Sequence, residues 1–312
     1  MSETIEAHIL NVGLGSSNLF VCPDGDVGVI DIEGGSLGKR ISRSATQYLK
    51  KYITEVVKIN SASTEIPKLF GTHSDIDHFG HTELLEQLPI QSVYFPTQIR
   101  TKNQVSRGIA DTLDEVMAAG YSPRKLSNTY SEDLLPDSNA KMYAVSPPSN
   151  PSSPVNKNDN SLCLIFSYEE KTILFPGDIE ERGVDWVTSD TRTKGIDCLV
   201  APHHGSGTVD YSSLLEHCDP DYIFVSSAHE YHDKRYDHPS RKFLNDAKRY
   251  GCEVFWTAVH GNIVATTDGS EWRVKSQQNY STDPDKLGDC AVDEADLCAF
   301  DDALVSGYPE SF

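Results

Sequence analysis

Residues 72–81 read Thr-His-Ser-Asp-Ile-Asp-His-Phe-Gly-His and place three imidazoles and two carboxylates directly after an apolar stretch. Groups of this kind repel or desolvate one another when they are buried together, unless a positive charge lies between them. A turn needs one Asp and no His, so turn formation does not account for the segment. A site for a divalent metal ion does, and it requires a fold that brings further ligands to this point.

Three later residues are candidates for those ligands, and each follows a predicted strand. Asp178 lies in Phe-Pro-Gly-Asp-Ile, while His203 and His204 lie in Ala-Pro-His-His-Gly-Ser after an apolar strand that ends at Val200. Active sites in layered α/β proteins gather at the carboxyl ends of strands. Alone, Asp178 is typical of a turn or a helix N-cap, and the His pair is typical of a solvated loop. Their association with the cluster at 73–78 favours metal ligation.

The spacing within the cluster predicts which ligands share an ion. His73 and Asp75 stand at alternate positions, and Asp77 and His78 follow them. In a turn at the end of a strand, this spacing aims the first pair at one ion and the second pair at another, with Asp178 as a bridge. One of the two adjacent histidines completes the shell, and the sequence does not decide which. The predicted metal ligands are His73, Asp75, Asp77, His78, Asp178, His203 and His204.

The order of the motifs resembles that of the metallo-β-lactamase-fold hydrolases, and specifically the soluble domain of the ComEC competence proteins. The segment at 73–78 is similar to that group's variant of HxHxDH, with Asp at the second ligand place. Order and spacing over about residues 7–275 make the resemblance specific. Six other segments resemble motifs of that group, and the group's motif is given in parentheses after each: 11–15 (DVGQG), 30–35 (iDtGg), 158–162 (NnnSlvL), 176–178 (tGD), 203–206 (HHGS) and 237–240 (gHPs).

The resemblance implies an α/β fold, a four-layer αββα sandwich of the metallo-β-lactamase type. The hydrolase domain would span residues 1–275, and residues 276–312 would form an acidic tail, docked or disordered. The residue pattern agrees, because runs of strands followed by helices, twice over, indicate two β-rich halves covered by helices. Strands are predicted at 7–12, 18–22, 27–32, 68–72, 161–167, 171–175, 198–202, 222–226, 253–257, 263–267 and 272–274, and helices at 41–57, 82–88, 108–119, 212–217 and 240–250.

The resemblance also implies a metal-dependent, nuclease-like hydrolase that cleaves phosphodiester bonds with water activated by two divalent ions, Zn²⁺ or Mn²⁺. Asp77 is expected to orient the hydroxide. Whichever of His203 and His204 does not ligate metal is expected to protonate the leaving group or to contact phosphate. The residues expected to contact substrate are Asn160, Ser206 and His238.

The sequence departs from the family pattern in several places. Asn11 and Leu14 replace the usual Asp and Gln, and His81 stands where a second Gly is common. No His occurs between His81 and His203, so the middle histidine of zinc-binding relatives is missing. The oxygen-richer ligand set favours a harder ion such as manganese over zinc. A degenerate, non-catalytic binding module is the alternative that this loss supports best.

Charge leaves the substrate class open. A formal charge of −20 disfavours non-specific nucleic-acid binding by the chain as a whole, yet basic residues cluster between Lys234 and Arg249. The resemblance favours DNA or RNA, whereas a small phosphodiester suits the acidic chain better. Hydrolysis of a carboxylic ester or a lactone is a further alternative within the enzyme class.

The sequence shows no pattern typical of a signal peptide or a membrane span. The first residues are acidic where a signal peptide would be basic, and no stretch approaches the roughly 20 apolar residues of a membrane span. The seven cysteines form no CxxC pair and fit reduced thiols. We therefore expect a cytoplasmic protein without membrane contact, whose acidic tail is a candidate surface for a protein partner.

Overall fold

The structure is a computed structural model that describes residues 4–13, 15–33, 52, 66–80, 90–97, 109–129, 133–136, 138–149, 156–227 and 238–277. The helices predicted at 41–57 and 82–88 lie outside the described residues, apart from position 52. So do His81, residues 234–237 of the basic segment and all but the first two residues of the predicted tail.

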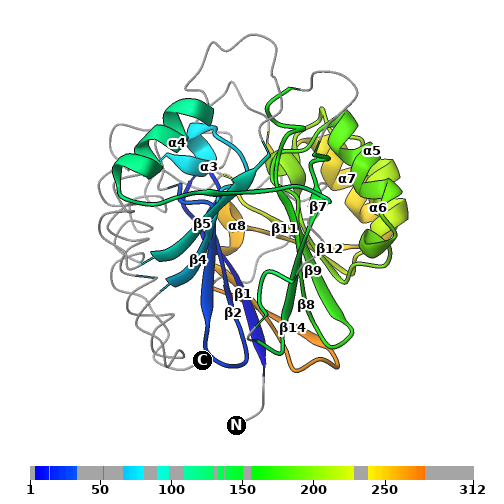
Figure 1. The fold of residues 1–312 in the computed structure, drawn as a ribbon. Helices are drawn as coiled ribbons and strands as arrows, with labels where there is room; N and C mark the ends of the chain where they lie inside the picture. Colours follow the sequence, from blue (N-terminus) through cyan, green and yellow to red (C-terminus); the bar gives the residue numbers. More distant parts are fainter. Residues whose placement is uncertain are drawn as a thin grey trace, which may run out of the picture.

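Two mixed sheets form the centre of the fold (Figure 1). The first sheet is antiparallel from β14 to β3 and parallel from β3 to β6, and the second is parallel from β12 to β9 and antiparallel from β9 to β7. In spatial order the first sheet consists of β14 (Trp272–Ser276), β13 (Ile263–Thr267), β1 (Ile5–Ile9), β2 (Asn18–Val21), β3 (Val27–Ile30), β4 (Ile66–Phe70), β5 (Ile90–Pro96) and β6 (Arg124–Leu126). The second consists of β12 (Glu253–Trp256), β11 (Tyr222–Val225), β10 (Cys198–Val200), β9 (Lys171–Phe175), β8 (Cys163–Tyr168) and β7 (Lys141–Ser146).

Helices cover the outer faces of both sheets (Figure 1). Helix α4 (Ile109–Ala118) and the single turn α3 (Ile76–Phe79) lie beside the first sheet. Helices α5 (Glu181–Ser189), α6 (Tyr211–Cys218) and α7 (Arg241–Tyr250) lie beside the second. The remaining short elements are η3 (Thr191–Thr193), η4 (Pro202–Gly205) and α8 (Thr257–His260).

Three hydrophobic clusters of described residues lie between these layers. The first lies between the sheets and includes Ile9 and Phe166. The second joins the first sheet to α4 through Val116, and the third joins the second sheet to α5, α6 and α7 through side chains such as Val187 and Phe243. Each large side chain buried in this way stabilises the fold by about 1.5–3 kcal/mol. The predicted α/β fold with four αββα layers is confirmed.

The parallel register sets where the chain leaves each sheet. Ile30 of β3 pairs with Phe70 of β4, and Val200 of β10 pairs with Phe224 of β11. The residues that follow these strands therefore emerge side by side at one edge. Two hydrogen bonds tie the edges of the two sheets together: Leu162 N donates to Thr72 O at 2.8 Å, and Ser226 Oγ donates to Gly15 O at 2.8 Å.

Eight of the described elements were not predicted: β5, β6, β7, α3, α5, α8, η3 and η4. Helix α5 buries only Gly183, Val184 and Val187 among its nine residues, so its apolar stripe is too narrow for a clear helical period. No helix in the described part of the chain has the length and the apolar character that crossing a bilayer demands.

Candidate metal centre

The cluster at 73–78 follows β4 and folds into α3 rather than an open turn. Asp75 precedes the helix, and its carbonyl oxygen accepts from the backbone N–H groups of His78 and Phe79 at 3.0 and 2.8 Å. Ser16 N donates to the carbonyl oxygen of Asp77 at 2.8 Å, which fixes α3 to the loop after β1. Gly15 permits this close approach, because a Cβ at its position would collide with the Asp77 carbonyl oxygen.

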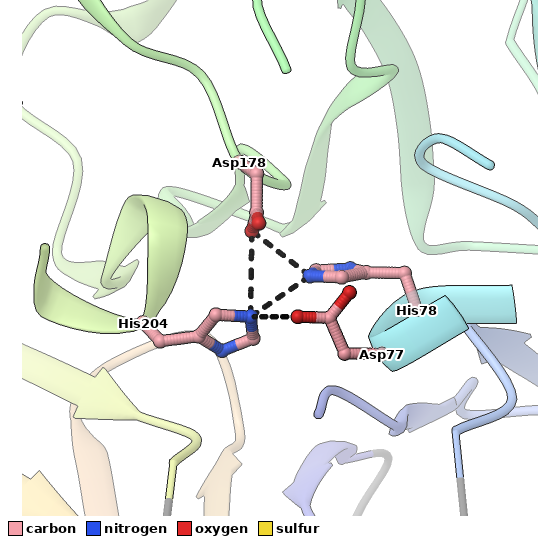
Figure 2. A group of neighbouring side chains, drawn as sticks. All are labelled: Asp77, His78, Asp178 and His204. Carbon is pink, nitrogen blue, oxygen red and sulfur yellow. Dashed lines mark hydrogen bonds and ion pairs between the residues drawn. The ribbon is translucent and has the colours of Figure 1, made fainter. Parts of the chain in front are cut away.

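Four side chains from three segments of the chain meet at this point (Figure 2). Ligand atoms of Asp77, His78, Asp178 and His204, the four-residue group, all lie within 4.8 Å of one another. His78 Nε2 lies 2.9 Å from Asp178 Oδ1 and 3.0 Å from His204 Nε2. His204 Nε2 is 3.7 Å from Asp178 Oδ1 and 3.8 Å from Asp77 Oδ2. Three of the four residues are buried, and Asp77 is partly exposed.

The hydrogen-bond partners of the two Nδ1 atoms determine which ring nitrogen is available to ligate a metal ion. His78 Nδ1 lies 2.7 Å from Asp31 Oδ2, and His204 Nδ1 lies 2.6 Å from the carbonyl oxygen of Ser226. Both partners can only accept, so each Nδ1 carries a proton, and each ring in its neutral form presents a lone pair at Nε2. Two lone pairs and a carboxylate oxygen in contact repel one another unless a cation lies among them. The donor set therefore fits a divalent ion.

Beside this group lies a second, looser one, the His73 group, made by His73, Asp75 and Asp178. His73 Nε2 is 3.8 Å from Asp75 Oδ2 and 3.7 Å from Asp178 Oδ2. This Nε2 atom is buried and has no hydrogen-bond partner, which is costly for a polar atom. Asp178 turns Oδ1 to the four-residue group and Oδ2 to the His73 group.

The protonation states follow from burial and charge. Burial lowers the pKa of His73 to about 4, so its ring is neutral and able to ligate metal. Burial also opposes a charge on His78, but the carboxylates of Asp178 and Asp31 outweigh it and raise the pKa of His78 well above 6.5. Burial disfavours the charged form of Asp178, yet the three nearby imidazoles outweigh it and hold its pKa well below 3.8. The centre thus favours positive charge beside the Asp178 carboxylate.

The sequence motifs did not assign a role to Asp31, which orients His78. Its carboxylate also accepts from Thr72 N at 2.7 Å and from Thr72 Oγ1 at 2.8 Å. Its backbone has φ of +64°, a conformation that Asp and Asn adopt more readily than most residues. A buried Asp directly after an apolar strand, inside the segment that resembles iDtGg, was the available signal. The Ser226 carbonyl had no sequence signal, since any residue supplies one.

The two adjacent histidines take different places. His204 belongs to the four-residue group, whereas His203 is 21% exposed and its Nε2 lies 4.0 Å from Asp178 Oδ2. His203 Nδ1 lies 3.1 Å from Glu180 Oε1. Burial opposes a charge on His203, but Glu180 outweighs it and raises the pKa of His203. Both histidines have positive φ, 49° and 55°, a strained backbone of the kind found at functional sites.

The three predicted substrate residues lie in different surroundings. The ring of His238 packs edge-on against His203, with centroids 5.3 Å apart. Asn160 is buried, and its Oδ1 has no hydrogen-bond partner. The hydroxyl of Ser206 instead bonds Thr208 Oγ1 at 2.9 Å and so stabilises its own loop.

A cavity of about 10 Å³ lies behind the four-residue group. It holds about one water-sized species, so it is not a substrate cleft. Among its lining residues are Asp31, Thr72, His78, Asp178 and His204.

No family model matches the sequence, and no curated protein matches it. Among solved structures the chain is similar to a mutant of the CmlA beta-hydroxylase, with 11% identity and a TM-score of 0.47 over 83% of this chain and 53% of that one. It thus spans about half of the CmlA chain. It is also similar to YhfI, a metallo-beta-lactamase fold protein from Bacillus subtilis, with 8% identity and a TM-score of 0.48 over 85% of this chain and 100% of that one. Likenesses this distant carry no argument about the chemistry of the present site.

Proposed function

We propose that the protein is a metal-dependent hydrolase that cleaves phosphodiester bonds. The observation that carries this proposal is the position of Asp178. One carboxylate oxygen faces His78 and the other faces His73, at 2.9 and 3.7 Å from the Nε2 atoms. A single buried carboxylate shared by two imidazole groups is suited to holding paired cations.

Bound divalent ions would supply a water of lowered pKa and would offset charge on the attacked phosphate. The side chains would hold these ions and position the reactants. Asp77 is the most exposed of the four-residue group, with a side chain that is 29% exposed. It is therefore suited to orienting the attacking water from the solvent side.

His203 is the candidate proton donor. When its ring is charged, Nδ1–H donates to Glu180 and Nε2–H stays available for the oxygen of the leaving group. Glu180 raises the pKa of His203, which favours this charged form near neutral pH. The adjacent ring of His238 is suited to contacting a phosphate oxygen on the same side.

The nuclease-like specificity rests on the likeness to the ComEC domain and remains the leading proposal. The described part of the basic segment adds little to it. Lys242 Nζ and Arg249 Nη2 both pair with Asp246, at 3.8 and 3.3 Å, so one carboxylate offsets part of their charge. With a formal charge of −20, this pairing supports a small phosphodiester as the second candidate.

Metal quantification combined with a substrate panel tests the proposal. The panel contains single-stranded DNA, RNA, a cyclic nucleotide, a choline-phosphate ester and a lactone. We expect a divalent metal to co-purify, and we expect phosphodiester cleavage that a chelator abolishes and Mn²⁺ or Zn²⁺ restores. A strong salt dependence of oligonucleotide binding would favour the nuclease. A protein without bound or activating metal would instead support the non-catalytic binding module.

A further inference from the structure

A lysine contacts one of the two groups of candidate ligands. Lys157 Nζ lies 2.5 Å from Asp75 Oδ1, while the other carboxylate oxygen of Asp75 faces His73. The lysine side chain is 42% exposed and that of Asp75 is 18% exposed. An ammonium group therefore already neutralises the carboxylate on which the His73 group depends.

The loop that carries Lys157 is anchored to the site. Asn156 Nδ2 donates to Glu180 Oε2 at 2.7 Å. Asp159 Oδ1 accepts from Glu180 N at 2.9 Å and from Gly183 N at 2.8 Å. These bonds on both sides of Lys157 hold the ammonium group near Asp75, so the contact is a feature of the fold.

The two groups differ in the ligands that they offer to a divalent ion. The four-residue group contains two imidazoles and two carboxylates within 4.8 Å of one another. Among the described residues, the His73 group contains one imidazole and two carboxylates. A cation that enters the His73 group must also displace the ammonium of Lys157 or tolerate its repulsion.

We propose that Lys157 competes with a second divalent ion for Asp75. The chain then binds one ion tightly at the four-residue group and a second ion weakly at the His73 group, only after Lys157 has left Asp75. This inference rests on the metal site of the proposed function. It adds that Lys157 controls how many ions the protein holds.

The contact between Lys157 and Asp75 is strong enough to weaken binding but not to prevent it. The two opposite charges attract each other at a separation of 2.5 Å. The lysine is exposed enough for water to solvate its ammonium group once it is displaced. The expected penalty for the second ion is about tenfold in its dissociation constant.

Metal titration of the full chain tests this inference, with Mn²⁺ and Zn²⁺ as separate probes and calorimetry or equilibrium dialysis as the readout. For the wild type we expect one tight ion and a second that binds at least about tenfold more weakly. Lys157→Met keeps the length of the side chain and removes its charge, so the second ion should bind about tenfold more tightly than in the wild type. Lys157→Arg keeps the charge, and the second ion should stay weak.

Lys141→Met is the matched control. Lys141 is similarly exposed, at 46%, and pairs with Asp133 at 3.0 Å at the start of β7. This variant should titrate like the wild type. Two equally tight ions in the wild type, or an unchanged second constant in Lys157→Met, would overturn the role of Lys157 while leaving the hydrolase proposal intact. No divalent ion in the wild type or in any variant would instead overturn the proposed function, and this inference with it.

Discussion

His78 and His204 lie 126 positions apart in the sequence, yet their Nε2 atoms are 3.0 Å apart in the structure. Each ring donates from Nδ1 to an acceptor behind it, so in the neutral form both present a lone pair to the same point. A cation at this point relieves their repulsion and binds the Asp178 carboxylate as well.

Neutralising a central carboxylate should remove metal and activity together. We expect Asp178→Asn and Asp77→Asn each to lower turnover of a phosphodiester by at least about 100-fold, because the amide is a poor ligand for the ion. Metal content measured beside turnover, with circular dichroism for the fold, checks this. Asp185→Asn, on the exposed side of α5, is the control. Full activity with unchanged metal content in both variants would contradict the assignment.

Asp31→Asn should weaken metal binding although it replaces none of the candidate metal ligands. Asn tolerates the φ of +64° at this position, so the backbone should stay in place. The amide supports the Nδ1–H of His78 less well than the carboxylate does, and the loss of such an orienting partner typically costs 10–100-fold in metal affinity. Competition with a fluorescent chelator measures the change. An affinity equal to that of the wild type would show that Asp31 does not tune His78.

Gly15→Ala should displace α3. The added Cβ would collide with the carbonyl oxygen of Asp77 and with the side chain of Glu33. Overpacking of this kind costs about 1–3 kcal/mol, and we expect weaker metal binding because Asp77 and His78 move with the helix. Urea unfolding and metal titration report the two effects. At Gly207 an added Cβ would meet Ser240 at an ordinary 3.5 Å, so Gly207→Ala should change neither quantity. Equal results for the two variants would refute the packing argument.

Asp190→Asn should change acid stability at a place away from the metal site. Burial disfavours the charged form of Asp190, but hydrogen bonds from Arg192 outweigh it and lower its pKa below 3.8. A carboxyl whose pKa is lower in the folded state stabilises the fold fully above its unfolded pKa and loses that effect as pH falls through the folded one. The variant should therefore lose about 1 kcal/mol of unfolding free energy at pH 7, and the gap to the wild type should close below about pH 4. A gap that is constant from pH 7 to pH 2.5 in denaturant titrations would rule out this linkage.

Several parts of the fold could be predicted because their signals are local. The apolar runs that became β9 and β13 have the bounds expected, and Ser240 before α7 is a typical N-cap that accepts from Phe243 N. By contrast, β6 has three residues, Arg124, Lys125 and Leu126, of which only Leu126 is buried. It is a strand because it pairs with β5 at the edge of the first sheet. A pattern of only three residues does not predict that pairing.

The sequence by itself determined the chemical types at the site: imidazoles and carboxylates after β4, β9 and β10. Residue identity and strand periodicity are properties of neighbouring positions. Only the tertiary structure decided that His204 rather than His203 joins His78, that Asp31 orients His78 and that Lys157 contacts Asp75. Those choices depend on the packing of two sheets whose parallel strands end at one edge, since distances between loops remote in the chain are set by the register and stacking of the strands that carry them.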